Sequence, residues 1–435
     1  MYCTEIETMP RQDLEQLQIE RLQATLNRVY RNVAFYKNAF DQAKVTFDTV
    51  RSIDDLRRLP LTTKDDLRKA YPYDMFALPL RDIVRIHATS GTTGRPIVTG
   101  YTRNDVHTWS ELMARQLCAV GITEHDVVQV AFNYGLFTGG LGFHYGAERI
   151  GASVIPSSPG GGNVLAQDVI MKDYKATALV TTPSYAVTMA NLLPHAGIHP
   201  EQLSLRCGIF GGEPWSESLR ELLEHKLRID AYDAYGVAEL MGPGVAGECS
   251  EKDGLHINED HFIVEVIDPQ SLEPVSLGRT GELVFTTITK EGFPLIRYRT
   301  GDLASLLESP CRCGRTLRRM SRVSGRTDDK FFFHGTHLLP SQIHEVLLQA
   351  EGIQPHYQIV LTRQDGVDAM EVKVAISEGI EGFDEVGTLV KMKDDIARML
   401  QERLGVQARV SFVEEVSIRP PGGGKRSPVV DLREQ

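Results

Sequence analysis

The stretch His87-Ala-Thr-Ser-Gly-Thr-Thr-Gly-Arg-Pro96 is the segment around which the rest of this sequence is organised. Apolar residues before it, from Ile83 to Ile86, and after it, from Ile97 to Tyr101, predict two strands. The loop between them offers free backbone N–H groups and hydroxyl donors, with no bulky side chain to exclude a polyanion. The Walker pattern G-x-x-x-x-G-K-[ST] is absent. The loop is therefore either a phosphate-binding loop of another type or a plain Gly/Thr turn.

Composition narrows the class of protein. The chain has 435 residues, 42% hydrophobic and 24% charged, which favours a globular protein of two or more domains. The net charge of −11 argues against a general nucleic-acid surface. No apolar run is long enough to span a bilayer, and the first residues have neither a basic nor an apolar signal region. We therefore expect a cytoplasmic protein without a nucleic-acid or membrane partner.

Strands alternating with helices predict a parallel sheet covered by helices in the first part of the chain. Residues 13–40 have helical spacing, Thr63 with Asp66 resembles a capping box, and a helix is expected over residues 105–120. The strands that we expect are 127–132, 152–156, 178–182, 207–210 and 231–235. From Gly254 shorter strands, at 262–268 and 281–287, predict an antiparallel β subdomain over about 254–325.

The last hundred residues predict a small α+β unit. We expect a strand at 331–333, a helix at 340–349, a hairpin turning at Asp365-Gly366, a helix at 383–404 and a strand at 408–414. The charged run Gly325-Arg-Thr-Asp-Asp-Lys330 has the composition of a linker. The predicted organisation is thus a large α/β N-terminal domain, 1–327, and a small mobile α+β C-terminal domain, 328–435.

Several later segments suit a nucleotide and an acid. Asn133 to Gly142 combines aromatic residues with four glycines after a strand, and Gly211-Gly-Glu-Pro214 would let backbone approach a flat base. In Ala234-Tyr-Gly-Val-Ala-Glu239 an aromatic ring could stack on a purine while a carboxylate holds Mg²⁺. Asp302 lies in a Thr-Gly-Asp turn, and Gly422-Gly-Gly-Lys-Arg426 places a lysine on a loop. Each segment alone has an ordinary structural explanation, such as a kinked helix start or a solvated side chain.

Together and in this order, the segments resemble the acyl-adenylate-forming superfamily of acyl-CoA synthetases, luciferases and adenylation domains. Further stretches resemble the phenylacetate–CoA ligase family across nearly the whole chain. These stretches are residues 131–142, Trp215 after Gly-Gly-Glu-Pro, Asp260-His-Phe, Glu265-Val-Ile-Asp-Pro269, Phe293-Pro-Leu-Ile-Arg-Tyr-Arg299 and Cys311-x-Cys-Gly-Arg-Thr316.

The resemblance implies a role for each matching position. The ATP- and AMP-binding residues would be Thr89, Ser90, Gly91, Thr92, Thr93, Gly94, Gly212, Glu213, Pro214, Asp233, Ala234, Tyr235, Gly236, Asp302 and Arg326. The pocket for the acid would be formed by Tyr134, Phe137, Thr138, Gly139, Gly140 and Ala234. Glu239 would bind Mg²⁺, Lys425 would be the adenylation lysine, Asp328 the hinge, and His334 with Gly335 the CoA side.

Two departures from the family pattern affect these roles. Arg95 stands in the phosphate loop where relatives commonly have lysine, and the two cations do not contact phosphate in the same way. His334 precedes Gly335 where relatives place an arginine, which changes the expected CoA-side contacts. Arg426-Ser-Pro428 after the lysine is also unusual.

The cysteines give a separate hypothesis. Six cysteines in a reducing compartment are not a disulfide framework. Cys249, His256, Cys311 and Cys313 would complete a closed Cys₃His zinc site, although their spacing is not a standard finger pattern. The alternative is a set of reduced cysteines beside a hydrogen-bonded histidine.

The function expected from the resemblance is ATP-dependent ligation of an aryl acid, phenylacetate or a related arylacetate, to coenzyme A. An acyl-adenylate forms with release of pyrophosphate, and the CoA thiol then displaces AMP. The expected cofactors and ligands are ATP, Mg²⁺, coenzyme A and a structural Zn²⁺, in a homodimer. The alternatives are an adenylating enzyme that serves a carrier protein, and a non-enzymatic homologue.

Overall fold

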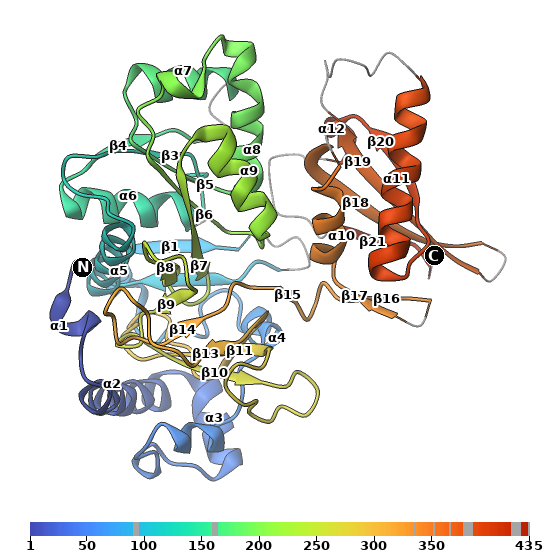
Figure 1. The fold of residues 1–435 in the computed structure, drawn as a ribbon. Coiled ribbons are helices and arrows are strands. Elements are labelled where there is room, and N and C mark those ends of the chain that lie inside the picture. Colours follow the sequence, from blue (N-terminus) through green and yellow to red (C-terminus); the bar gives the residue numbers. More distant parts are fainter. Residues whose placement is uncertain are drawn as a thin grey trace.

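The structure is a computed structural model of the full chain. It describes residues 1–89, 95–136, 138–158, 164–334, 336–350, 353–364, 367–376, 386–418 and 428–433. A large N-terminal part and a small C-terminal part lie side by side (Figure 1). Among the described residues, no helix combines the length and apolarity needed to cross a bilayer.

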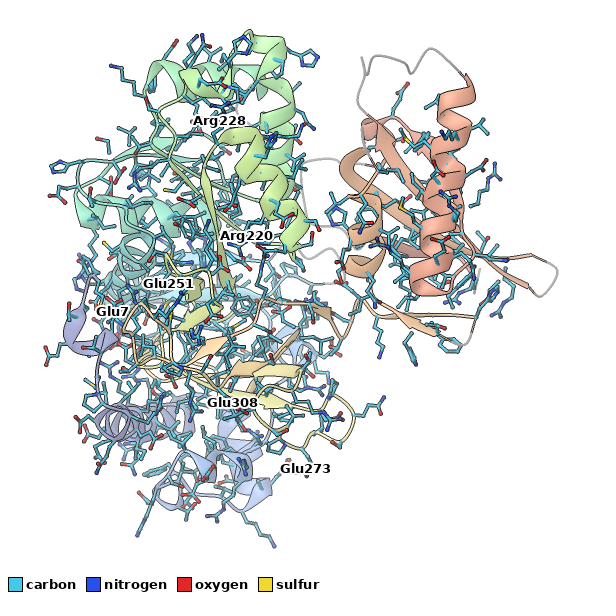
Figure 2. The ribbon with its side chains drawn as sticks, viewed as in Figure 1. Glu7, Arg220, Arg228, Glu251, Glu273 and Glu308 are labelled. Atoms are coloured by element: carbon cyan, nitrogen blue, oxygen red, sulfur yellow. The ribbon has the colours of Figure 1, made fainter. Side chains whose placement is uncertain are left out.

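The N-terminal segment forms two long helices instead of the single one expected over residues 13–40. α2 (Arg11–Asn32) ends where Val33 adopts an extended conformation, and α3 (Ala34–Ala43) begins at the next residue. The spacing of apolar residues does not indicate the break, because both helices pack apolar residues into the same core. A short helix α1 (Thr4–Glu7) precedes them, and the buried Glu7 carboxylate, labelled in Figure 2, pairs with Arg315.

The two strands predicted around the opening loop form a hairpin. β1 (Arg85–Ala88) pairs antiparallel with β2 (Val98–Tyr101), with Ala88 opposite Val98 at the end nearest the loop.

A nine-stranded sheet forms the centre of the large part. Its strands are β3 (Val127–Val130), β4 (Ser153–Pro156), β5 (Ala178–Thr181), β6 (Cys207–Gly211), β7 (Asp230–Val237), β8 (Gly242–Glu248), β9 (Leu255–Ile257), β13 (Leu306–Leu307) and β14 (Arg319–Met320). The order is β13-β14-β9-β8-β7-β6-β5-β3-β4. All pairs from β4 to β7 are parallel, as predicted, and those from β7 to β13 are antiparallel.

Helices cover both faces of the parallel half. They are α5 (Arg103–Ala119), α6 (Gly139–Ile150), α7 (Val164–Asp173), α8 (Pro183–Leu192) and α9 (Glu217–Leu227). The short helix α4 (Lys64–Lys69) instead contacts the strand at residues 298–304. Side chains alternate between faces along each strand, so Val180 packs into the core with α5 and α6, whereas Leu179 packs into the core with α8 and α9. The predicted capping box at Thr63 and Asp66 is present. A second box, at Thr102, starts α5 two residues earlier than expected.

The antiparallel region is smaller than the predicted β subdomain. β10 (Phe262–Ile267), β11 (Gly281–Thr287), β12 (Tyr298–Ala304) and β15 (Gly325–Arg326) form a separate four-stranded antiparallel sheet. β9, β13 and β14, which lie within the same stretch of sequence, instead extend the nine-stranded sheet. The sequence did not indicate which sheet these three strands join, because two- and three-residue strands carry no readable period.

A buried ion pair joins α9 to β8 of the large sheet. Arg220 of α9, labelled in Figure 2, donates two hydrogen bonds to the Glu248 carboxylate of β8, at 2.7 and 2.8 Å. Both side chains are almost fully buried, so removing one partner would leave an uncompensated charge.

The C-terminal part is the small α+β unit that was predicted. Its elements are β16 (Phe331–Phe333), β17 (Thr336–Leu338), α10 (Pro340–Leu347), β18 (Ile353–Gln364), β19 (Val367–Ile376), α11 (Val386–Leu404), β20 (Arg409–Val413), α12 (Glu415–Ile418) and β21 (Val429–Asp431). Its sheet has the order β20-β19-β18-β21, and it has its own core. The Ser341 hydroxyl donates to the Ser324 carbonyl at 2.8 Å, and Leu348 packs against the core of α8 and α9.

Candidate functional site

The described residues of the predicted nucleotide site come from the large sheet and from the separate four-stranded sheet. Ala234, in β7, lies opposite Gly211, the last residue of β6. Glu239 follows β7, Asp302 lies in β12, and Arg326 lies in β15. The carboxyl ends of parallel strands are the usual ligand-binding edge of such sheets.

Asp302 and Tyr235 form one hydrogen-bonded unit with Arg326. The Tyr235 hydroxyl donates to Asp302 Oδ2 at 2.7 Å, and Arg326 pairs with Oδ1 of the same carboxylate. Burial and the Asp302 charge raise the pKa of Tyr235 well above its ordinary value, so the hydroxyl remains a donor at neutral pH. Asp302 is only 6% exposed. The residues expected for the ribose and for the adenine face therefore hold each other in place.

Glu239 is fixed by two side chains from the loop and strand after β11. The Tyr298 hydroxyl donates to Glu239 Oε1 at 3.2 Å. Lys290 Nζ donates to the Leu240 carbonyl at 2.6 Å and lies 3.4 Å from the Glu239 carbonyl. Burial lowers the pKa of Lys290 to about 7, while the nearby carboxylates of Asp105 and Glu239 oppose that shift. A carboxylate oriented in this way is a suitable Mg²⁺ ligand.

The Gly-Gly-Glu-Pro segment is shaped by close backbone approach. A Cβ on Gly211 would lie 2.3 Å from the Ala234 carbonyl oxygen, and Gly212 has a φ of +85°. The Glu213 carboxylate accepts the Ser184 N–H at 2.7 Å, in the first turn of α8. The Glu213 side chain is thus engaged with the helix, and Pro214 follows it.

Asp233 is engaged in a charged contact. Arg322 donates to its carboxylate at 3.2 Å, and the same guanidinium lies 4.2 Å from the centre of the Trp215 ring. Asp233 is 9% exposed. The carboxylate is an acceptor for a donor such as an exocyclic amino group.

The expected pocket for the acid lies at the start of α6. Thr138, Gly139 and Gly140 are buried there, and Ala234 is buried in β7. A Cβ on Gly140 would approach the Tyr134 ring to 3.2 Å, so the glycine allows the ring to lie against the helix. The Tyr134 hydroxyl lies 3.3 Å from His144 Nδ1. Phe137 is outside the described residues.

The phosphate loop is described only at its ends. The Thr89 N–H donates to the Ile97 carbonyl, and the Ile97 N–H donates to the Thr89 hydroxyl, both at 3.0 Å. These bonds close the base of the loop. The Arg95 guanidinium lies 5.9 Å from the Tyr71 ring. Ser90, Gly91, Thr92, Thr93 and Gly94 are outside the described residues.

The residues predicted for the C-terminal side are partly described. The Asp328 carboxylate accepts from Arg326 at 2.8 Å, and this guanidinium lowers the pKa of Asp328 although burial opposes the shift. His334 has a φ of +45° in the turn after β16, and its Nε2 lies 3.0 Å from the Asp368 carbonyl. Gly335 and Lys425 are outside the described residues.

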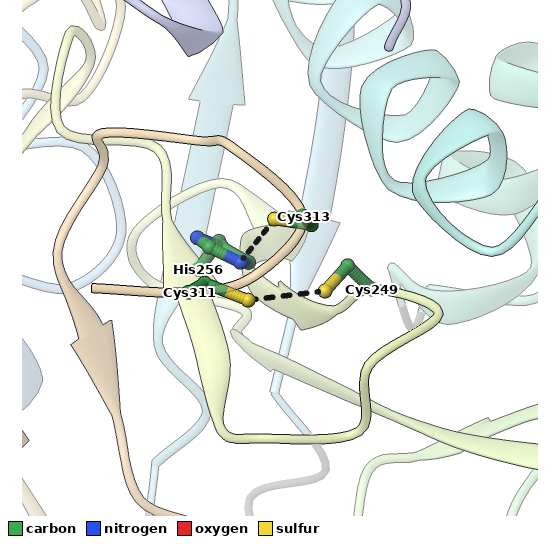
Figure 3. Close-up of side chains that lie close together, drawn as sticks. All are labelled: Cys249, His256, Cys311 and Cys313. Atoms are coloured by element: carbon green, nitrogen blue, oxygen red, sulfur yellow. Dashed lines mark hydrogen bonds between the residues drawn. The ribbon is translucent and has the colours of Figure 1, made fainter. Parts of the chain in front are cut away.

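The four predicted zinc ligands lie together, as Figure 3 shows. The ligand atoms of Cys249, His256, Cys311 and Cys313 are all within 4.8 Å of one another. Cys249 Sγ is 3.7 Å from Cys311 Sγ, and Cys313 Sγ is 3.3 Å from His256 Nε2. The other nitrogen of His256 lies 3.3 Å from the Leu317 carbonyl, and burial lowers the pKa of the ring to about 4.

Three side chains of the site were not predicted from the sequence. Lys290, Tyr298 and Arg322 each act on a residue that had been identified, but they lie 51, 59 and 89 positions from it in the chain. The only available signal was that Tyr298 belongs to the quoted stretch Phe293–Arg299.

Comparisons with known proteins cover the whole chain. The family model described as AMP-binding enzyme matches residues 12–289, and the one described as AMP-binding enzyme C-terminal domain matches residues 335–433. The phenylacetate-coenzyme A ligase of Thermus thermophilus is 42% identical, covering 100% of both chains. That of Escherichia coli is 44% identical, covering 98% of this chain and 97% of the relative.

A solved structure gives the same fold and distinguishes two domain arrangements. 2-Hydroxyisobutyryl-CoA ligase in its postadenylation state is 29% identical and superposes with a TM-score of 0.90, covering 99% of this chain and 92% of the other. The same protein in its thioesterification state gives 0.72 at the same coverage. The arrangement of the two parts here is thus nearer to the first state. The chain belongs to the AMP-binding enzyme family and, within it, to the phenylacetate–coenzyme A ligases.

Proposed function

We propose that this protein is an ATP-dependent aryl-acid–CoA ligase that acts on phenylacetate or a related arylacetate through an acyl-adenylate. The observation that carries the proposal is the similarity over full length, at 42–44% identity, to phenylacetate-coenzyme A ligases. The described contacts of Asp302, Tyr235 and Glu239 support it, because they orient two carboxylates and an aromatic ring at the ligand-binding edge of the sheet.

In the first half-reaction, a carboxylate oxygen of the acid attacks the α-phosphorus of ATP. A C–O–P linkage forms, the bond from the α-phosphorus to the bridging oxygen breaks, and pyrophosphate leaves. Asp302 would hold the ribose hydroxyls, residues 89–94 the β- and γ-phosphates, and Lys425 the reacting carboxylate and α-phosphate. Mg²⁺ held by Glu239 would supply charge neutralisation, and the remaining contribution of the protein is positioning.

In the second half-reaction, the CoA sulfur attacks the acyl carbon, AMP leaves with the former carboxylate oxygen, and the thiol proton is released. We propose that the C-terminal part, beginning at Asp328, rotates between the two steps and brings His334 and Gly335 to the CoA side. The large N-terminal domain would then be residues 1–327.

The acid would occupy a flat pocket formed by Tyr134, Phe137, Thr138, Gly139, Gly140 and Ala234. The buried glycines at the start of α6 support this assignment, because they leave room beside the Tyr134 ring.

The test measures pyrophosphate release and thioester formation in parallel, with ATP, Mg²⁺, CoA and a panel of aryl acids. Both products are expected with an arylacetate, and both should be lost in Lys425→Ala. Pyrophosphate without thioester would favour a carrier protein as acceptor. Absence of both products across the panel would favour the non-enzymatic alternative and overturn the proposal.

We also propose a structural zinc ion at the Cys₃His cluster. Two sulfurs bound at about 2.3 Å in tetrahedral geometry lie about 3.8 Å apart, and the Cys249–Cys311 separation is 3.7 Å. The ion would fasten the loop after β8 to the loop before β14. Protein expressed with sufficient zinc should contain about one zinc per chain by mass spectrometry, and Cys311→Ser should lose it while Cys118→Ser retains it. Less than one tenth of a zinc per wild-type chain would contradict the proposal.

We further propose that the protein is a cytoplasmic homodimer, as the family resemblance implies. Light scattering after gel filtration should give twice the chain mass of 48.5 kDa. A mass equal to one chain would exclude the dimer, and a cell-fractionation assay would test the compartment.

A further inference from the structure

Lys290 is a buried amine that contacts the turn carrying the proposed metal ligand. It lies in the loop between β11 and β12, and its side chain is fully buried, with 0% exposed. Its Nζ lies 4.2 Å from the centre of the Tyr101 ring and 5.5 Å from that of Phe293. Burying an amine is unfavourable unless its N–H groups find acceptors. The hydrogen-bond acceptors of Lys290 therefore indicate its structural role.

Those acceptors belong to the turn that carries Glu239. Lys290 Nζ donates to the Leu240 carbonyl at 2.6 Å and lies 3.4 Å from the Glu239 carbonyl. In the same turn, the Leu240 and Met241 N–H groups both donate to the Val237 carbonyl, at 3.0 and 3.3 Å. The turn thus has internal partners for these N–H groups and uses Lys290 for the two carbonyls. Without Lys290, two buried acceptors would lose this donor.

The loop that carries Lys290 is itself anchored to the base of α5. The Asp105 carboxylate accepts the Glu291 and Gly292 N–H groups at 2.7 and 2.9 Å. The Glu291 carboxylate accepts the Thr102 hydroxyl at 2.9 Å. Asp105 is 1% exposed, so these bonds are shielded from water. Lys290 therefore extends from a fixed loop and not from a free one.

The Tyr101 ring connects Lys290 to the phosphate loop. Tyr101 is the last residue of β2, the strand that follows the loop. Its ring stacks on Trp109 at 5.2 Å and meets the His87 ring edge-on at 5.5 Å. His87 lies two residues before Thr89, at the other end of the loop. The Lys290 amine thus lies between the hairpin of the phosphate loop and the turn of Glu239.

We propose that Lys290 is a positioning residue that fixes the Glu239 carboxylate relative to the hairpin of β1 and β2 and so sets where the metal meets the phosphates of ATP. This inference rests on the proposed role of Glu239. Either protonation state of Lys290 can donate the hydrogen bonds. Because the metal and the leaving pyrophosphate act only in the first half-reaction, the loss of Lys290 should affect adenylation and spare thioester formation from a preformed adenylate.

The test compares Lys290→Met, which keeps the length of the side chain without its donors, with the wild type. Lys252→Met is the matched control, since Lys252 is a partly buried lysine whose partners, Glu224 and Asp230, lie outside the proposed site. Manganese replaces magnesium in a binding assay with ATP and no acid. Binding of Mn²⁺–ATP is read from the enhancement of water-proton relaxation that follows addition of protein. Pyrophosphate release is titrated with Mg²⁺, and thioester formation is measured from synthetic phenylacetyl-adenylate and CoA.

We expect Lys290→Met to weaken Mn²⁺–ATP binding about tenfold, the effect of about 1.4 kcal/mol, and to raise the Mg²⁺ requirement for pyrophosphate release by a similar factor. Thioester formation from the adenylate should stay within about twofold of the wild type, and Lys252→Met should match the wild type throughout. Unchanged Mn²⁺ binding, or an equal loss of both half-reactions, would overturn the proposal.

Lys290→Arg, which keeps a donor, provides a second variant and should recover part of the metal affinity. Failure of both variants to fold would assign Lys290 to stability and overturn the positioning role. Failure of the proposed function is separate, because it would appear as a wild-type protein that forms no product, whatever its Mn²⁺ affinity.

Discussion

The Asp168 side chain gives a prediction that is independent of the active site. It lies in α7 with 0% exposed, and neither carboxylate oxygen has a hydrogen-bond partner among the described residues. Its neighbour in the helix, Gln167, accepts from Gln129 at 3.2 Å, and Met171, one turn later, belongs to the core of α8 and α9. Burial raises the pKa of Asp168 from 3.8 to about 7.

The sign and size of the effect on stability follow from linkage. Below about pH 4 the carboxyl is protonated in both the folded and the unfolded state, and its titration costs nothing. As the pH rises toward 7, the unfolded chain ionises while the folded chain keeps its proton, so the free energy of unfolding falls by about 1.4 kcal/mol per pH unit. The cost is therefore about 1.5 kcal/mol at pH 5 and about 4 kcal/mol at pH 8.

Asp168→Asn removes the charge and keeps the shape, so it should stabilise the protein more at pH 8 than at pH 5. For an N-terminal part of about 330 residues, the difference of about 2.5 kcal/mol corresponds to a melting-temperature gain that is about 4 °C larger at pH 8. Fluorescence of Trp109 and Trp215, the two tryptophans, reports unfolding of the N-terminal part alone. Asp173→Asn, an exposed carboxylate on the same helix, is the control. A gain for Asp168→Asn that does not depend on pH would refute the reasoning.

Further outcomes can be measured at other positions. Tyr298→Phe removes the hydroxyl that donates to Glu239 and should slow pyrophosphate release roughly tenfold to a hundredfold. The reason is that a hydrogen bond to a charged group contributes about 1.5–3 kcal/mol. A rate within twofold of the wild type would contradict that contribution. Gly211→Ala places a Cβ 2.3 Å from the Ala234 carbonyl and should lower the free energy of unfolding by about 1–3 kcal/mol, seen in urea titrations. Gly387→Ala, in the exposed part of α11 with no atom near its Cβ, should instead raise the stability of the C-terminal part by up to about 1 kcal/mol, and a loss there would show that the helix does not accept alanine.

Much of the architecture could be predicted because local sequence patterns, such as apolar runs and capping residues, determine it. The buried strands 127–132, 178–182 and 207–210 are apolar runs between helices, and the box at Thr63 and Asp66 is a local capping signal confirmed in the structure. The break at Val33 could not be predicted, since both helices present apolar residues to one core. The placement of β9, β13 and β14 was missed because their pairing depends on chain segments far apart.

The candidate site shows the same division. The family resemblance identified Asp302, Tyr235 and Glu239 by motif, and the structure joins the first two through a 2.7 Å hydrogen bond. It could not indicate Lys290 or Arg322, since an isolated basic residue in a sequence carries no sign of which carbonyl or carboxylate it will meet. The proposed zinc ligands could be predicted only in part. Their types were informative, and their proximity is a property of the folded chain.

The register of β15 against β12 has a mechanical consequence. Arg326 is the strand partner of Asp302, so the chain leaves the large part directly from the proposed ribose contact. If the C-terminal part turns about Asp328, the rotation begins two residues after Arg326, which is itself a proposed nucleotide contact. A chain that ends immediately after Arg326 would keep Arg326 together with the hydrogen-bonded pair of Asp302 and Tyr235. The proposed ribose contacts therefore belong to the N-terminal part, and the C-terminal part can rotate without displacing them.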